Sequence, residues 1–211
     1  ESLPVEKRSK TGIVSTFRNF GAIVHTPRYM LYVLQLAFAQ GILFAYIASS
    51  PFIVQQHYGF SPLMFSICFG INAIFIVISA ASAIKFRRLE QALHYGSTGM
   101  VVVSALLLVA LVLDCNFWIY ELLLIGLLSM LGLTFTASNT LAMDCEHNNA
   151  GMASALLGAL GFAFGGIVSP LVGLGNIMVS TGIIFLMGSI CSYVCTRYAL
   201  HRNLKTVCQR S

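Results

Sequence analysis

Charged side chains are scarce in this sequence: Asp, Glu, Lys and Arg make up 9% of its 211 residues. A soluble globular protein contains about 25% charged residues. Hydrophobic residues reach 57% here, with a mean hydropathy of +0.84. This composition excludes a disordered chain, a coiled coil and a soluble enzyme domain. The net charge of +5 does not indicate nucleic-acid binding, because nucleic-acid-binding proteins present their charge on a hydrated surface. An integral membrane protein remains.

Motifs for catalysis, cofactor binding and metal binding are also missing. The sequence has no Walker A loop, no dinucleotide-binding fingerprint and no serine-nucleophile GxSxG motif. Its six cysteines include no CxxC pair, so we expect neither a disulfide framework nor a zinc site. The run from Asp144 to His147 contains four potential metal ligands, but consecutive residues rarely converge on one ion, and we interpret it as a polar loop. We therefore expect no enzyme activity, no cofactor and no metal.

Long apolar runs dominate the chain instead. A helix needs about 20 apolar residues to cross the hydrocarbon core of a bilayer, and six such stretches are present. Transmembrane β-barrels show alternating segments of about ten residues, which this sequence lacks. We predict an all-α membrane fold with a single bundle over residues 28–199. Its six spans are expected at 28–54, 61–84, 91–113, 117–143, 149–174 and 176–199.

The basic residues all fall in regions that six spans place on the same side of the membrane. Lys and Arg are enriched in cytoplasmic segments, so both termini are predicted to be cytoplasmic, with 1–27 as a leading segment and 200–211 as a tail. The breaks at 55–60, 114–116 and 173–176 contain no Lys or Arg. The basic residues are Lys7, Arg8, Lys10, Arg18 and Arg28, then Lys85, Arg87 and Arg88, then Arg197, Arg202, Lys205 and Arg210.

Three of the spans contain polar and aromatic side chains at helical spacing. Amide side chains in lipid need partners, so Gln35, Asn72 and Asn139 must face protein or water. One interpretation is hydrogen bonding between helices, at about 0.6 kcal/mol per contact. The other is a wet, aromatic-rimmed cavity that binds a small molecule, and the convergence of three stripes favours it. The candidate cavity residues are Tyr32, Gln35, Tyr46, Phe65, Asn72, Phe75, Thr136 and Asn139.

The remaining spans differ in composition. The third is almost wholly apolar, as expected of a peripheral helix that faces lipid. In the fifth, Gly161 and Gly165 have the spacing that allows close helix packing, and Pro170 is expected to kink or loosen the helix, so these residues serve packing or a gate. Glu121 lies about one turn from the outer end of the fourth span, and we interpret it as a carboxylate that extends to water.

Two stretches resemble Bcr/CflA-type drug-resistance transporters of the major facilitator superfamily. Residues 44–62, FAYIASSPFIVQQHYGFSP, resemble the seventh helix and following loop of that family. Residues 150–158, AGMASALLG, resemble the start of its eleventh helix. The opening ESLP is similar to the segment that closes the sixth.

This resemblance implies the C-terminal half of a twelve-helix transporter, built as a 3+3 inverted repeat, whose N-terminal six-helix half is missing from the chain. Such proteins lie in the inner membrane and export small drug-like molecules in exchange for protons. The proton-coupling carboxylate is expected in the missing half. The loop from Lys85 to Glu90 keeps the basic charge of the family but departs from its glycine- and aspartate-bearing pattern. The alternative is a six-helix membrane protein without transport activity, such as an assembly factor or complex subunit.

Overall fold

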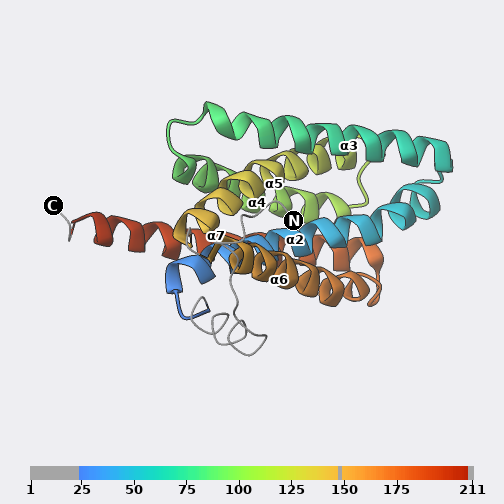
Figure 1. The fold of residues 1–211 in the computed structure, drawn as a ribbon. Coiled ribbons are helices and arrows are strands. Elements are labelled where there is room, and N and C mark those ends of the chain that lie inside the picture. Colours follow the sequence, from blue (N-terminus) through green and yellow to red (C-terminus); the bar gives the residue numbers. More distant parts are fainter. Residues whose placement is uncertain (1–23, 147–148, 209–211) are drawn as a thin grey trace, which may run out of the picture.

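The computed structural model describes residues 24–146 and 149–208. Six long helices run up and down in alternation through this part of the chain (Figure 1). Each is long and apolar enough to cross a membrane. The helices are α2 (Pro27–Pro51), continued by the π-helix η2 (Phe52–His57); α3 (Pro62–Ser82), followed by the 3-10 helix η3 (Ala83–Lys85); α4 (Leu89–Val112); α5 (Phe117–Cys145); α6 (Ala150–Leu171); and α7 (Ile177–Cys208).

The helix ends follow the local sequence. Ser61 caps α3, where its hydroxyl accepts from the Met64 amide at 3.3 Å, and Pro62 follows at the first helical position. Asn116 caps α5 in the same way, accepting from the Trp118 amide at 3.0 Å. The first helix differs from the predicted span at its end. Pro51 lacks an N–H group to continue the α-helical ladder, and the chain changes there to a π-helix.

Four helices form the centre of the bundle, and two lie outside it. The helices α2, α4, α5 and α7 pack in a ring, in which α2 contacts α5 and α7, and α4 contacts the same two. On the outside, α3 packs on α5 and α6 packs on α2, at opposite sides of the bundle (Figure 1). Exchanging the first three helices with the last three reproduces this contact pattern. The six-helix half-bundle with its 3+3 repeat is thereby confirmed.

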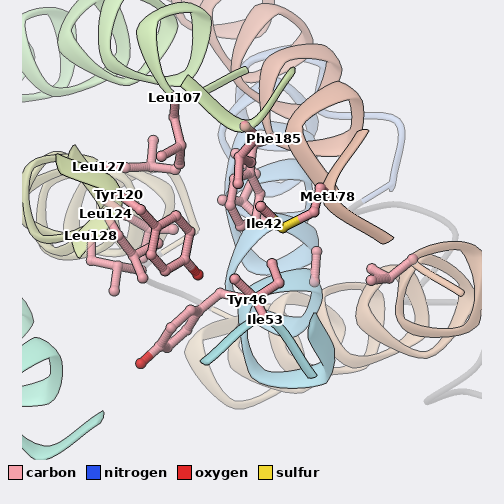
Figure 2. Packing of buried hydrophobic residues seen from close by; sticks show 14 of the residues in the cluster. Ile42, Tyr46, Ile53, Leu107, Tyr120, Leu124, Leu127, Leu128, Met178 and Phe185 are labelled. Atoms are coloured by element: carbon pink, nitrogen blue, oxygen red, sulfur yellow. The ribbon is translucent and has the colours of Figure 1, made fainter. Parts of the chain in front are cut away.

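Two groups of buried side chains make up the core. The larger surrounds Tyr46, Leu124 and Phe185, where α2, α5 and α7 meet (Figure 2). The second lies around Tyr29 and Tyr32 near the first turns of α2. The Tyr29 hydroxyl donates to the Ala153 carbonyl at 2.7 Å and thus joins α2 to α6.

The outer helices are the least buried. In the most apolar 18-residue window of each helix, 11% of the residues of α3 and 22% of those of α6 are buried, against 56% in the first helix. The third span, α4, was expected to be a peripheral helix that faces lipid; it packs against α5 and α7 on one side and is exposed on the other, as at Val102 and Leu106, and its contact with lipid stays a prediction. Apolar composition does not distinguish a lipid-facing side from a protein-facing one.

Candidate functional site

Asn72 is the centre of a polar cluster to which three helices contribute. Its Nδ2 atom, on α3, donates to the Tyr46 hydroxyl of α2 at 3.3 Å and to Oε1 of Glu121 of α5 at 3.0 Å. Exposed fractions are 1% for Asn72, 2% for Tyr46 and 6% for Glu121. The structure therefore brings two of the predicted cavity residues, Tyr46 and Asn72, into direct contact, together with a carboxyl group that was not among them.

The expectation that Glu121 extends to water is wrong, because its side chain points into the bundle. Residues of α5 spaced by three or four share one face, and Phe117, Glu121, Leu124 and Leu128 are all buried. Trp118, in contrast, is 62% exposed on the other side of the helix. This spacing was visible in the sequence. Distance from the helix end was the weaker guide to where the carboxyl group lies.

Aromatic rings extend the cluster along α3. Tyr46 stacks on Phe69 with ring centroids 5.5 Å apart and an interplanar angle of 12°. Phe69 in turn contacts Phe65 at 5.7 Å, so the predicted Phe65 reaches the cluster through a residue that the sequence analysis missed. From α5, Tyr120 lies next to Tyr46 in the core (Figure 2). The site thus combines aromatic surface with three polar groups.

Three oxygen atoms in this cluster are buried and have no hydrogen-bond partner among the described residues. They are Oδ1 of Asn72, Oε2 of Glu121 and the hydroxyl oxygen of Tyr120. Buried polar atoms are nearly always paired, and leaving one unpaired is costly. The cluster can therefore bind a proton on its carboxyl group, or accept further hydrogen bonds from a water molecule or from a donor group of a ligand.

Two other predicted cavity residues lie away from this cluster. Gln35 is fully buried, and its Nε2 atom donates to the Ser192 hydroxyl of α7 at 3.0 Å. Tyr32 is fully buried in the second core group, and its carbonyl accepts from the Ser138 hydroxyl of α5 at 3.2 Å. Both residues join α2 to neighbouring helices.

The last three predicted cavity residues lie toward the surface of the described chain. Phe75 of α3 is 41% exposed, and Asn139 of α5 is also exposed. Thr136 is half-buried, and its hydroxyl donates to the carbonyl of Gly132 in its own helix at 3.4 Å. These side chains do not meet Asn72 and are open to whatever covers α3 and α5.

The small residues of α6 pack against α2. A Cβ atom on Gly161 would lie 3.2 Å from Oε1 of Gln40, and one on Gly165 would overlap the Phe44 ring. Pro170 is the second-to-last residue of α6, so it lies at the end of this helix and does not interrupt its middle. Close packing of α2 and α6 follows from the glycines.

The two loops beside the start of α5 are joined to each other. His57 and Asp114 are linked by a hydrogen bond of 2.7 Å between Nε2 and Oδ1. The Tyr58 hydroxyl donates to the Cys115 carbonyl at 2.9 Å. Burial raises the pKa of Tyr58 well above its usual range, so the phenol stays neutral and keeps this bond at physiological pH. These contacts position α3 against α5 next to the polar cluster.

A separate apolar groove of about 430 Å³ lies where α2, α6 and α7 meet. Its walls include Ile42 of α2, Phe164 of α6 and Met187 of α7. No polar side chain of the cluster around Asn72 lines it. Within residues 24–146 and 149–208, no group of His, Cys, Asp and Glu has the arrangement of a metal site.

Comparison with known proteins identifies the family. Over 96% of its length the chain is 33% identical to an uncharacterized MFS-type transporter, YdgK, of Bacillus subtilis (strain 168), and covers 52% of that protein. Over 90% of its length it is 25% identical to a bicyclomycin resistance protein homolog of Haemophilus influenzae (strain ATCC 51907 / DSM 11121 / KW20 / Rd), and covers 49% of it. The chain thus spans about half the length of these relatives. Residues 1–170 match the model of the Major Facilitator Superfamily, and with its six-helix repeat the chain belongs to this superfamily of membrane transporters.

Proposed function

We propose that this chain is half of a multidrug exporter that moves small drug-like molecules out of the cell in exchange for protons. The observation that carries the proposal is the cluster of Tyr46, Phe69 and Asn72 inside a transporter bundle. Sites for small molecules are mainly apolar and aromatic, with a few polar groups that orient the ligand. The name of the Haemophilus relative, a bicyclomycin resistance protein homolog, supports a drug as the ligand.

The complete transporter needs a second six-helix unit. Transporters of this kind bind substrate near the membrane midplane, between two repeats. The exposed sides of α3 and α6 fit contact with such a unit. Phe75, Thr136 and Asn139 then line the space between the halves, while Gly161 and Gly165 let α6 slide on α2 as a gate and Pro170 loosens the end of that helix.

The proposed location is the inner membrane, with both termini in the cytoplasm. The sequence supports this orientation, because all twelve Lys and Arg fall in the leading segment, around the break between the second and third predicted spans, and in or next to the tail, which the predicted topology puts on one side. In the part of the chain that the structure describes, Lys85, Arg87 and Arg88 lie between α3 and α4, at the same end of the bundle as the first turn of α2.

Drug susceptibility in cells that express the protein from its complete gene tests the proposal. Tyr46→Ala should lower resistance to planar aromatic drugs more than to small aliphatic ones, because ring stacking contributes about 0.5–1.5 kcal/mol beyond burial. Tyr46→Phe, which keeps the stack on Phe69, should retain most of the resistance. Tyr95→Ala, at a tyrosine 62% exposed on α4, is the matched control and should have no effect.

The amount of protein in the membrane must be measured for each variant, since Tyr46 is buried. Resistance should be compared at equal membrane levels of protein. An equal loss for planar and aliphatic drugs would mean that Tyr46 only packs. No change in any drug susceptibility on deleting the gene would contradict drug export and favour a role without transport.

A further inference from the structure

The surroundings of the Glu121 carboxyl group would make an unpaired carboxylate energetically unfavourable. Its Oε1 atom accepts a single hydrogen bond, from Asn72 at 3.0 Å, and its Oε2 atom is buried without a partner among the described residues. No Lys or Arg in the described part of the chain forms an ion pair with it. A buried carboxylate needs a counter-ion or several hydrogen bonds. The arrangement with α3 packed on α5 therefore fits Glu121 as a neutral carboxylic acid and not as a carboxylate.

The groups that face Glu121 come from each helix packed around it. Tyr46 of α2, Cys68 of α3 and Tyr120 of α5 itself are its titratable neighbours, and none of them is a cation at neutral pH. Helix α4 also packs against α5, but Glu90, His94 and Tyr95 lie in its first two turns, at the opposite end of the bundle. Nothing among these neighbours supplies the positive charge that an anion would need.

A proton fits this site better than a larger cation does. Glu121 is 6% exposed and Asn72 1%, so protein encloses their polar atoms, and the groove of about 430 Å³ lies elsewhere and is apolar. Two further oxygen atoms of the cluster, Oδ1 of Asn72 and the Tyr120 hydroxyl oxygen, are also buried without a partner among the described residues.

We propose that Glu121, which is hydrogen-bonded to Asn72 and lies near the Tyr120 hydroxyl, is a proton-binding residue through which this half of the protein takes part in proton coupling. The inference rests on the drug:proton exchange proposed above and places a coupling group in this chain, where the family resemblance implies one only in the other half. The carboxyl group is neutral while α3 packs on α5. When the two helices separate, water reaches it, its O–H bond breaks, and the proton leaves to water as the carboxylate remains.

Infrared spectroscopy of the complete protein tests proton binding without any substrate. The C=O stretching band of a buried carboxylic acid should be present at neutral pH in the wild type, and it should be lost in Glu121→Gln. That variant keeps an acceptor for Asn72 but has no acid. Glu90→Gln, at a half-buried carboxyl group in the first turn of α4, should leave the band unchanged. An identical spectrum for Glu121→Gln and wild type would overturn the proposal.

A second variant, Glu121→Asp, keeps the proposal testable if Glu121→Gln does not fold. Glu121→Asp keeps an acid on a shorter side chain, so the band should shift rather than disappear. An unshifted band in Glu121→Asp would show that it comes from another residue and would also overturn the proposal.

Transport measurements separate this inference from the proposed function. In vesicles, Glu121→Gln should lose drug accumulation driven by a pH gradient while retaining exchange of labelled for unlabelled drug. Retained pH-driven accumulation in that variant would reject Glu121 as the coupling residue and leave drug export intact. If the wild type shows the band but moves no drug, the proposed function fails and the proton-binding site stands.

Discussion

A buried polar side chain in a membrane bundle is informative through its partners. Asn72 uses one amide nitrogen to contact two helices, through Tyr46 and Glu121, whereas Gln35 contacts one, through Ser192. The two amides look alike in the sequence, since each lies on a polar helical stripe. The difference is that Asn72 meets an ionisable group next to an aromatic stack. We therefore assign Asn72 to the functional site and Gln35 to the contact between α2 and α7.

The contact between Gln35 and Ser192 should be worth little. Hydrogen bonds between membrane helices average about 0.6 kcal/mol, and the serine hydroxyl can turn to a carbonyl of its own helix when Gln35 is lost. In a double-mutant cycle of Gln35→Leu and Ser192→Ala, the coupling in the free energy of unfolding should be about 0.6 kcal/mol. Unfolding in mixed detergent measures it. A changed drug profile in Gln35→Leu at unaltered stability would instead place this amide at the substrate.

Close contacts at glycine residues, which have no side chain, help to position the helices of this bundle. Gly132 of α5 lies directly under the backbone of α3, where a Cβ atom would overlap the Ile76 carbonyl group. Next to this contact the Ser79 hydroxyl of α3 donates to the Ser129 carbonyl of α5. Because α3 packs mainly on α5, this close approach sets the distance between the two helices that hold Asn72 and Glu121.

Adding one methyl group at Gly132 should push α3 away from α5. Gly132→Ala should lower the free energy of unfolding by about 1–3 kcal/mol, the usual cost of overpacking, although alanine is the better helix former. Gly158→Ala is the matched control, because its Cβ would meet no heavy atom within 4 Å, and it should be neutral or slightly stabilising. Thermal unfolding in detergent distinguishes them. Equal stability of the two variants would mean that α3 shifts without loss.

The sequence predicted the elements well and their neighbours less well. All six helices were predicted from apolar length, and the predicted cavity residue Asn72 is one of the two buried residues of α3. The pairing of Asn72 with Glu121 and the place of Phe69 were not predicted. Helical periodicity identifies which residues share a face, but it does not identify which helix that face meets.

At the scale of the whole molecule, the bundle has two kinds of helix. Each helix of the ring of α2, α4, α5 and α7 packs against at least two others of the ring. In contrast, α3 and α6 each have one main partner and large exposed areas. The polar cluster lies where an outer helix, α3, meets two ring helices. A movement of α3 relative to the ring would open the cluster, because α3 has one main partner, α5.

Cysteine labelling checks the proposed orientation of the bundle. Cys115 lies in the turn between α4 and α5, and Cys145 is the last residue of α5, at the other end. A membrane-impermeant thiol reagent added to intact cells should label Cys115 and leave Cys145 unmodified until the cells are permeabilised. Variants that keep only one of these two cysteines make the measurement unambiguous. Labelling of Cys145 but not Cys115 in intact cells would reverse the topology.

The π-helix η2, which follows Pro51, contains one residue more than an α-helix over the same path would need. A π-helix spaces its hydrogen bonds five residues apart instead of four, so removing one residue from η2 can restore an ordinary α-helix. Deleting the exposed Gln56 should therefore leave the amount of folded protein, measured by size-exclusion chromatography, nearly unchanged. Deleting Ala37 in the middle of α2 should abolish folding, because it rotates Tyr46 and every later side chain of that helix by about 100°. A change in length should thus be tolerated in η2 but not in the middle of α2.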